Sequence, residues 1–471
     1  MNSRSDSSTR QLAAFTVGAA NFPPLARSRA VDAITDCIGC MVAGTREALA
    51  GPLLRVLPSA DAANGSASAA LVGTGRFAAP PDAALFNGTA AHALDYDDTN
   101  HPAYAHPSAV LVPTLLALAP GVQARGSDLV TAYIIGLEVF GKLGRALNVA
   151  HYKRGWHATC TFGTLAATAA ASRLLGLDEQ RTIMALGIAA SSASGLRANF
   201  GSMVKPLHAG QAARNGVLAT LLAREGFVAS ETVLEHRYGY CAVFNDGIDL
   251  DLEPLAAFGD PLEILTDYGI ALKMFPSCGA THPGIEAALE IHRELDGARI
   301  RAVRAGVCEM ALAPLIYVMP NTALEGKFSM HYCLAAALVD GVVNLSTFTD
   351  AKVADPRIRA LISRIDMEVD ERVRDESEFP TAVRVQTESG RILERMVLLA
   401  IGKPDRWLTA TQLYGKFAEC ASRALSPAQI DEVFQRLRAL DSASIFDARV
   451  PVSSGRSTDE PPPLATQVAA R

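Results

Sequence analysis

The sequence is short of the features that mark several common classes of protein. Aromatic residues make up only 6% of its 471 residues, and the net charge is −6, from 43 Lys and Arg against 49 Asp and Glu. No overall positive field is therefore available to attract nucleic acid or an anionic membrane surface. An anionic substrate would need a locally basic pocket.

Long apolar runs are also scarce. The longest low-charge stretch, 157–175, holds several Thr and small residues and contains Arg173, whereas a membrane span needs roughly 20 strongly apolar residues. Residues 11–20 are too few for a signal peptide and lack its basic start. We therefore expect a cytoplasmic protein with neither a membrane span nor an export signal.

Cysteine pairs with a recognisable spacing are scarce as well. The eight cysteines are scattered, which fits a reducing compartment better than a disulfide framework. Cys37 and Cys40 form a CxxC within an apolar helical pattern, but no second pair completes a zinc site. We interpret both as core residues, because free Cys is among the most buried residue types.

The composition that remains is that of a globular protein, with 49% hydrophobic and 20% charged residues, and the length favours two large domains. Apolar residues recur at spacings of three and four, so 8–267 is expected to be helical. Ser127 is expected to cap one helix, and Gly176 to end another before an Asp178 cap.

The pattern changes after residue 267, and a smaller α+β domain is expected over 268–398. Helical character returns over 399–450, which we expect to pack on the first domain, and the Pro- and Ser-rich tail 451–471 is expected to be disordered. The fold class is thus mainly α. Within 268–398, alternation of apolar and polar residues predicts strands at 300–310 and 365–369 and a hairpin that turns at 388–390. A helix is expected between these strands, at 328–338.

The densest polar cluster lies between two apolar helices. Three His and three Asp fall within fifteen positions, and such groups are costly to bury unless they are paired or functional. A helix cap and turn would explain one or two of them. A metal site is a sharper alternative, but no recognised ligand spacing appears, so no metal is expected. The residues are His92, Asp95, Asp97, Asp98, His101 and His106.

Three further segments carry chemically useful side chains. His157 follows Gly155-Trp156, and Lys273 precedes Phe275-Pro276-Ser277-Cys278. Lys205 stands before Pro206, which predicts that it lies off the helix body. A Lys about 4 Å from a carboxylate gains roughly 4 kcal/mol at an effective dielectric near 20. A solvated loop Lys is the simpler alternative, whereas Arg197 is expected to add a bidentate fork.

These four segments, in this order, resemble the MmgE/PrpD family over about residues 8–449. The family includes 2-methylcitrate dehydratase, cis-aconitate decarboxylase and iminodisuccinate epimerase. The resemblance implies a large all-helical domain built from both ends of the chain plus a smaller α+β lid domain, usually in a homodimer, and no cofactor. By similarity to cis-aconitate decarboxylase, the implied pocket residues are Asp95, Thr99, His106, His157, Lys205, Lys273 and Tyr317.

The implied reactions share one requirement. Each makes or quenches an enolate-like carbanion next to a carboxylate, so each needs cations for the carboxylates and a group that moves one proton. We expect a lyase on a small di- or tricarboxylate, dehydratase-like, with decarboxylase and epimerase as alternatives. The expected catalytic residues are His106, His157, Tyr317, Asp95 and Lys205, and the expected substrate-binding residues are Thr99, Lys273, His208 and Arg197.

Two other classes of function stay open from the sequence. A metal-dependent hydrolase could use the His and Asp cluster, and a non-catalytic helical binding protein would need none of this chemistry. The chain also departs from particular family members. Animal decarboxylases have His at the position of Cys278, and 2-methylcitrate dehydratases have an Asp-Asn after the His106-Pro107-Ser108 segment, where this chain has Ala109-Val110.

Overall fold

The computed structural model describes residues 7–60, 68–247 and 250–445. The chain divides into two compact units, of which the first combines Met1–Ala271 with Thr409–Arg471 and the second is Leu272–Leu408. The domain boundaries proposed from sequence, after residues 267 and 398, stay predictions. The predicted disordered tail lies outside the described residues.

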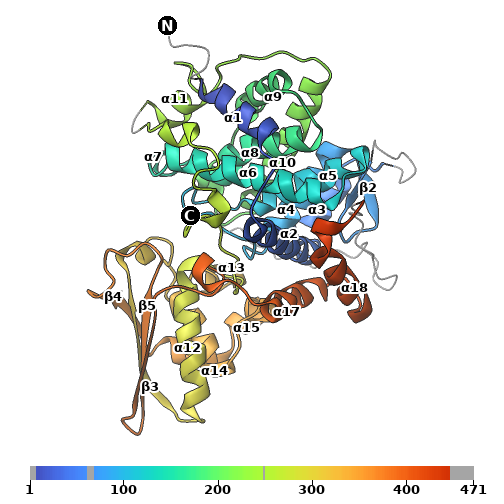
Figure 1. Ribbon diagram of the computed structural model, residues 1–471. Coiled ribbons are helices and arrows are strands. Elements are labelled where there is room, and N and C mark those ends of the chain that lie inside the picture. Colours follow the sequence, from blue (N-terminus) through green and yellow to red (C-terminus); the bar gives the residue numbers. More distant parts are fainter. Residues whose placement is uncertain (1–6, 61–67, 248–249, 446–471) are drawn as a thin grey trace. The chain divides into compact units, whose positions relative to one another are not determined.

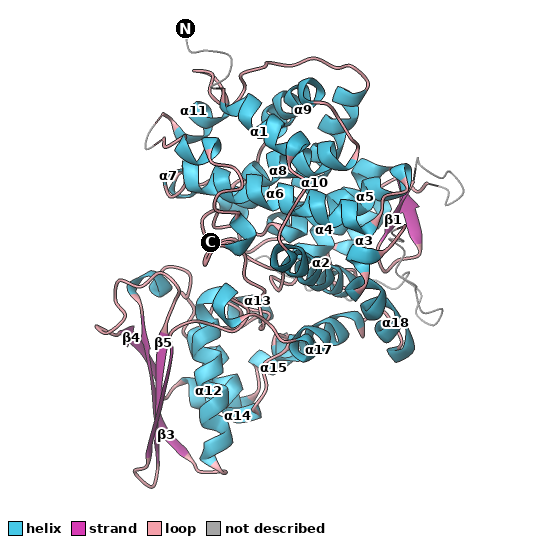
Figure 2. Ribbon diagram, in the orientation of Figure 1, coloured by secondary structure: helices cyan, strands magenta, loops and turns pink. Residues whose placement is uncertain are grey.

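The first unit is almost entirely helical, as Figures 1 and 2 show. A short antiparallel hairpin, β1 (Ala69–Leu71) and β2 (Arg76–Ala78), is added to it. Its described α-helices are α1 (Ser8–Gly18), α2 (Pro24–Gly44), α3 (Ala50–Val56), α4 (Pro80–His92), α5 (Ser108–Val122), α6 (Gly126–Leu147), α7 (Ala150–Lys153), α8 (Ala158–Leu174), α9 (Glu179–Ser192), α10 (Val204–Arg224), α11 (Tyr240–Asn245), α17 (Ala410–Ala421) and α18 (Pro427–Arg438).

Helix α8 is the centre of this unit. Every residue from Ala158 to Ser172 is buried, and α5, α6, α9 and α10 pack against it. The helix is rich in Ala and Thr, so its neighbours approach closely with few large side chains between them. The hydroxyl of Thr164 is satisfied inside the helix by the carbonyl of Cys160, four residues earlier, at 2.8 Å, which lets a polar residue stay in the core.

Helices α4 and α10 cross at a pair of glycines. A Cβ added to Gly210 would lie 2.1 Å from the carbonyl oxygen of Leu85, and one added to Gly88 would lie 2.7 Å from Cα of Gly210. Real Cβ atoms do not approach backbone so closely, so only glycine permits this crossing. The contact brings the last turn of α4, which ends at His92, near the first turns of α10, which carry Lys205 and His208.

The second unit is a four-stranded sheet covered by helices α12 and α14. The strand order is β4-β3-β5-β6, with β3 and β4 parallel and the other pairs antiparallel. Its elements are α12 (His282–Leu295), β3 (Ile300–Val307), α13 (Ala323–Gly326), α14 (Met330–Asp340), α15 (Asp350–Val353), α16 (Pro356–Ile362), β4 (Ile365–Val369), β5 (Thr381–Thr387) and β6 (Ile392–Val397).

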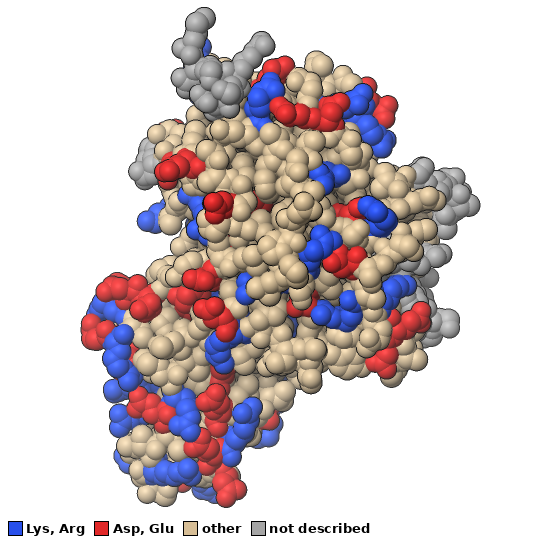
Figure 3. All heavy atoms as spheres, viewed as in Figure 1, with Lys and Arg blue, Asp and Glu red and all other residues tan. Residues whose placement is uncertain are grey.

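The core of the second unit lies between this sheet and its helices. Ile291 of α12, Val303 of β3 and Val383 of β5 are among its buried residues. Several side chains that point the other way, such as Arg304, Arg384 and Glu394, are charged. Figure 3 shows Lys, Arg, Asp and Glu interspersed over the sheet-bearing unit on the visible face. The chain is thus mainly helical with a smaller α+β part, as predicted.

The structure confirms some of the predicted turns and helix ends and corrects one. The predicted hairpin is β5 and β6, and α8 ends at Leu174, before Gly176 at φ +65° and the Asp178 cap, whose carboxylate accepts the Arg181 N–H at 2.8 Å. The predicted Ser127 cap is wrong, because α6 begins at Gly126. Within the described residues, no helix is both long and apolar enough to cross a bilayer.

The glycine crossing yields a stability prediction. Gly210→Ala should lower the free energy of unfolding by about 1–3 kcal/mol, the usual cost of overpacking, because the new methyl meets backbone. Gly415→Ala is the matched control: it lies within α17 with nothing within 4 Å of its added Cβ, so it should be neutral or stabilising by up to about 1 kcal/mol. Urea unfolding measures both, and equal stability of the two variants would refute the crossing argument.

Candidate functional site

The cluster of His and Asp residues lies in the connection between α4 and α5. Helix α4 ends at His92, and Asp95 then adopts a left-handed backbone conformation with φ 54°. A non-glycine residue seldom adopts this conformation unless its surroundings hold it there. The turn redirects the chain, so that Asp95 and Asp97 no longer follow the helical periodicity.

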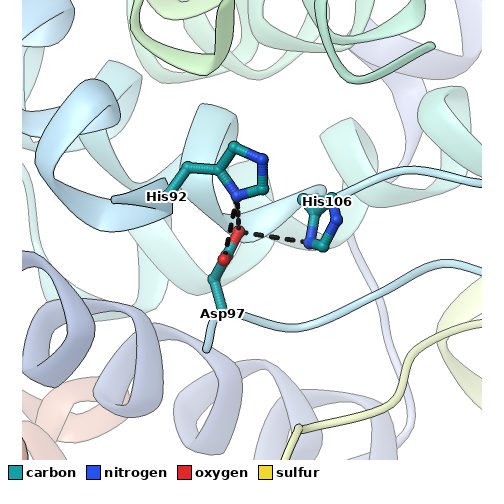
Figure 4. Close-up of side chains that lie close together, drawn as sticks. All are labelled: His92, Asp97 and His106. Atoms are coloured by element: carbon teal, nitrogen blue, oxygen red, sulfur yellow. Dashed lines mark hydrogen bonds and ion pairs between the residues drawn. The ribbon is translucent and has the colours of Figure 1, made fainter. Parts of the chain in front are cut away.

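The buried carboxylate of Asp97 joins two of the histidines, as Figure 4 shows. His92 Nδ1 lies 2.9 Å from each Asp97 oxygen, and His106 Nδ1 lies 3.4 Å from Asp97 Oδ2. The side chains of His92 and Asp97 are 0% exposed. A carboxylate buried in this way is stable only when hydrogen-bond donors surround it, and the two imidazoles supply them.

The hydrogen bonds of His106 define its tautomer. Its Nδ1 also lies 2.9 Å from the carbonyl oxygen of Asp98, and a carbonyl oxygen can only accept, so Nδ1 carries the proton. In the neutral ring, Nε2 then carries the lone pair. The same reasoning applies to His92, whose Nδ1 donates to Asp97. The Nε2 of His92 is buried and has no hydrogen-bond partner among the described residues.

Burial sets the charges of this group. It lowers the pKa of His92 to about 4 and lowers the pKa of His157 well below its ordinary value, so both rings are neutral at pH 7. Burial alone would raise the pKa of Asp97, but His92 and His106 hold it well below its ordinary value. At pH 7 the ionised carboxylate of Asp97 therefore faces a neutral His92 ring.

An ion pair lies beside His106 on the other side. Lys205 Nζ is 2.8 Å from Asp95 Oδ1, and the same oxygen is 3.9 Å from His106 Nε2. The side chains of His106, Asp95 and Lys205 are 12–15% exposed, in contrast to the sealed His92 and Asp97. The groups able to react are thus accessible, whereas those that orient them are not.

The position of Lys205 corrects one expectation. It was predicted to lie off the helix because Pro206 follows it, but both residues belong to the first turn of α10. Proline fits there because the first N–H groups of a helix have no partner within the helix. Lys205 Nζ also lies 5.5 Å from the centre of the Phe200 ring.

His157 and His208 form a second pair within this unit. His157 occupies the N-cap position of α8, and its Nδ1 lies 2.9 Å from Nδ1 of His208, one turn after Lys205 on α10. Two imidazole nitrogens at this distance share one proton, so one ring donates and the other accepts. The His157 ring centre is 6.2 Å from that of His92, which is 4.3 Å from that of His106. The sequence prediction of His106, His157, Lys205, Asp95 and His208 therefore describes residues that the structure brings together.

The other predicted residues either make further contacts within the first unit or belong to the second unit. Thr99 is half-buried and pairs through its backbone with Ala271 at 2.9 Å in both directions. Arg197 uses part of its guanidinium for another contact: its Nη1 donates to the Tyr152 carbonyl at 2.7 Å, and the guanidinium carbon lies 3.7 Å from the Tyr152 ring centre. Its part in binding an anion stays a prediction. Lys273, which is buried, and Tyr317, which is half-buried, lie in the second unit, and their part in the site stays a prediction.

The central triad also has the composition of a metal site. One possible ligand atom from each of His92, Asp97 and His106 falls within 4.8 Å of the others, a donor set that suits zinc. However, the Nδ1 of His106 donates to the Asp98 carbonyl and the Nδ1 of His92 faces Asp97, so a metal would have to use the Nε2 atoms of these rings. Hydrogen bonds therefore explain the arrangement of the triad, and the absence of a metal remains a prediction.

Two protein-family models match the chain. The MmgE/PrpD N-terminal domain matches residues 10–253, and the MmgE/PrpD C-terminal domain matches residues 275–439. The chain belongs to the MmgE/PrpD family. The four motifs on which the resemblance was based all lie within the two matched regions or, for Lys273, between them.

Relatives in the MmgE/PrpD family are named cis-aconitate decarboxylases. The human protein is 32% identical over 310 residues, 61% of each chain, and the mouse protein is 33% identical over 304 residues, 62% of each chain. These matches span less than two thirds of the length of either mammalian relative. The protein of Aspergillus terreus is 27% identical over 398 residues, 79% of this chain and 80% of its own.

Sequence reasoning missed a second buried carboxyl group in this MmgE/PrpD protein. Both oxygens of Asp98 face Ser108: Oδ1 accepts the Ser108 N–H at 3.1 Å, and Oδ2 contacts Oγ. That hydroxyl lies 2.6 Å from the Tyr133 hydroxyl. Burial raises the pKa of Asp98 to about 8. Asp98 was visible in the polar cluster, but nothing in its spacing distinguished a neutral acid from the ionised Asp97.

The protonation of Asp98 predicts how stability depends on pH. Because its pKa is higher in the folded state than in the unfolded state, where it is near 3.9, folding takes up a proton and stability falls as pH rises towards about 8. Asp98→Asn mimics the neutral acid, so it should remove a slope of at most about 1.4 kcal/mol per pH unit. Urea unfolding between pH 5 and 8 tests this, and identical slopes for both proteins would show that Asp98 is ionised.

Proposed function

We propose that this protein is a cofactor-free lyase that moves a proton at carbon next to a carboxylate of a small di- or tricarboxylate. The observation that supports this most strongly is the environment of His106. Asp97 and the Asp98 carbonyl hold its Nδ1–H, while its Nε2 lies beside the Asp95–Lys205 ion pair. A ring oriented from behind can take or give a proton at the opposite nitrogen.

The proton carrier and the cation have complementary roles in this proposal. Nε2 of His106 takes the proton, and Asp97 then stabilises the imidazolium from the Nδ1 side, as the carboxylate of a catalytic triad does. The Lys205 ammonium and Nε2 of His106 both lie beside the same Asp95 oxygen. In this proposal the ammonium binds a carboxylate of the substrate and stabilises the negative charge that spreads into that carboxylate. Asp95 orients Lys205 until substrate arrives. The shared proton of His157 and His208 provides a second donor or acceptor near His92.

Decarboxylation is the first reaction to test, because the matched relatives carry that name. In this reaction the bond from carbon to the leaving carboxylate breaks, its electron pair stays on the substrate, and a protonated His106 delivers a proton to carbon as CO₂ departs. Dehydration of a 2-methylcitrate-like substrate, which the sequence placed first, is the second candidate. There His106 takes the C–H proton and then delivers it to the departing hydroxyl group, which leaves as water, so that His106 returns to its neutral form. Lys273, Tyr317 and Thr99 are proposed further substrate contacts, and a homodimer and a cytoplasmic location stay predictions.

The test is a turnover assay after extensive dialysis against EDTA. We expect activity on at least one of cis-aconitate, 2-methylcitrate, citrate and iminodisuccinate. Lys205→Met should lower kcat/KM by about 10- to 100-fold, since a charge-assisted contact contributes about 1.5–3 kcal/mol. Lys153→Met, which removes an exposed lysine of α7, is the matched control and should leave kcat/KM unchanged.

Two results would contradict the proposal. Activity that is lost with EDTA, restored by zinc and indifferent to Lys205→Met would indicate a metal-dependent hydrolase on the His92, Asp97 and His106 triad. Tight binding of a carboxylate with no turnover of any of the four would indicate a binding protein.

A further inference from the structure

A buried lysine near the C-terminal end of the first unit reaches the loop that carries the site. Lys416 lies on α17, and its side chain is 1% exposed. Its Nζ is 2.7 Å from Asp36 Oδ1 and 2.9 Å from Asp36 Oδ2, on α2, and it donates to the carbonyl oxygen of Tyr96 at 2.8 Å. The same ammonium lies 4.2 Å from the centre of the Tyr96 ring.

The packing of α17 on α2 brings this ammonium into place. Gly39 lies one turn after Asp36 on α2, and a Cβ there would lie 3.0 Å from Cδ2 of Phe417. A larger residue at Gly39 would require Phe417, the neighbour of Lys416 on α17, to shift. Helices α2 and α17 are therefore closely packed beside the buried Asp36–Lys416 ion pair, which lets the two charges meet.

The acceptor in the loop is chemically significant because of its neighbours. Tyr96 lies between Asp95, which binds Lys205, and Asp97, which binds His92 and His106. Its carbonyl belongs to the peptide group that leads into Asp97, so a hydrogen bond at this oxygen restrains the rotation of that peptide. The restraint acts directly after the left-handed Asp95, where the backbone would otherwise relax.

We propose that Lys416 is a positioning residue of the site: by binding the Tyr96 carbonyl it holds the Asp95–Asp97 loop in the conformation that aims both carboxylates. The alternative is that Lys416 only neutralises Asp36. Neutralisation alone would not require the ammonium to donate to a loop carbonyl and to lie over the ring of the same residue. The kinetic part of this inference depends on the proposed function, whereas the geometric part does not.

The decisive variant removes both buried charges together. Asp36→Leu/Lys416→Met leaves no unpaired charge, so it should fold, because buried ion pairs can often be replaced by apolar residues of similar volume. The Tyr96 carbonyl nevertheless loses its donor. We expect kcat to fall by about 10- to 100-fold, the order of loss that a displacement near 1 Å can cause, with a smaller change in KM.

A second measurement reads the loop without substrate. The Nδ1–H of His92 binds Asp97, and that of His106 binds the Asp98 carbonyl beside the Asp97 carboxylate. Both protons should resonate far downfield in proton NMR of ¹⁵N-histidine-labelled protein, with His92→Gln assigning the His92 signal. These signals should shift or vanish in the double variant. These signals report on the loop even if the protein turns over none of the four carboxylates. Failure of the proposed function can therefore be distinguished from failure of this inference.

Two single variants complete the design. Asp36→Asn keeps Lys416 and its bond to Tyr96, so it should lose stability but keep kcat and the downfield signals. Lys142→Met is the matched control: Lys142 is also buried, pairs with Glu138 and donates to the carbonyl of Pro261 at 3.2 Å, outside the Asp95–Asp97 loop. It should cost stability alone.

The inference is overturned if the folded double variant keeps wild-type kcat and unchanged downfield signals, because Lys416 would then serve only to neutralise Asp36. If the double variant does not fold, Asp36→Asn decides the question. Loss of kcat and of the signals in folded Asp36→Asn would show that the charge of the pair, and not the carbonyl contact, controls the loop. Their retention supports the inference.

Discussion

A single buried carboxylate, that of Asp97, is the charge around which the rest of the site is arranged. An ionised carboxylate without solvent must be surrounded by donors, and this one takes them from His92 and His106. The consequence reaches the opposite side of each ring, because an imidazole that donates at Nδ1 has its lone pair at Nε2. The requirement to satisfy one buried charge thereby determines which nitrogen of His106 is available for proton transfer.

Close contacts between helices bring the residues of this site together. The glycines at the crossing of α4 and α10 allow the helix that ends at His92 to approach the helix that begins with Lys205 and His208. The small side chains of α8 let His157, at its start, be surrounded by other helices. Substitutions at these small residues would therefore alter the site without touching any reacting group.

Sequence reasoning found this site because its polar residues interrupt apolar helices, but it could not assign their partners. Helical periodicity predicts side-chain direction only as far as His92; after the left-handed Asp95 it no longer says where Asp97 and Asp98 point. Arg197 was expected to bind an anion, and this stays a prediction; its contacts with the carbonyl and ring of Tyr152, 45 residues earlier, could not be foreseen from the local sequence. Lys416 left no signal at all, since its partners lie 320 and 380 residues away in the chain. Regular elements such as the β5–β6 hairpin were easier to predict, because the turn residues and the alternation of apolar and polar residues are close together in the sequence.

The central claim is that His106 moves a proton to or from carbon, and solvent deuterium tests it most directly. With a substrate that is turned over in D₂O, the account predicts carbon-bound deuterium next to a carboxylate, detected by NMR in the product or recovered substrate. The rate of its incorporation should fall by about 10²- to 10⁴-fold in His106→Ala, the usual contribution of a general acid or base. Full conversion without carbon-bound deuterium, or undiminished labelling in His106→Ala, would contradict it.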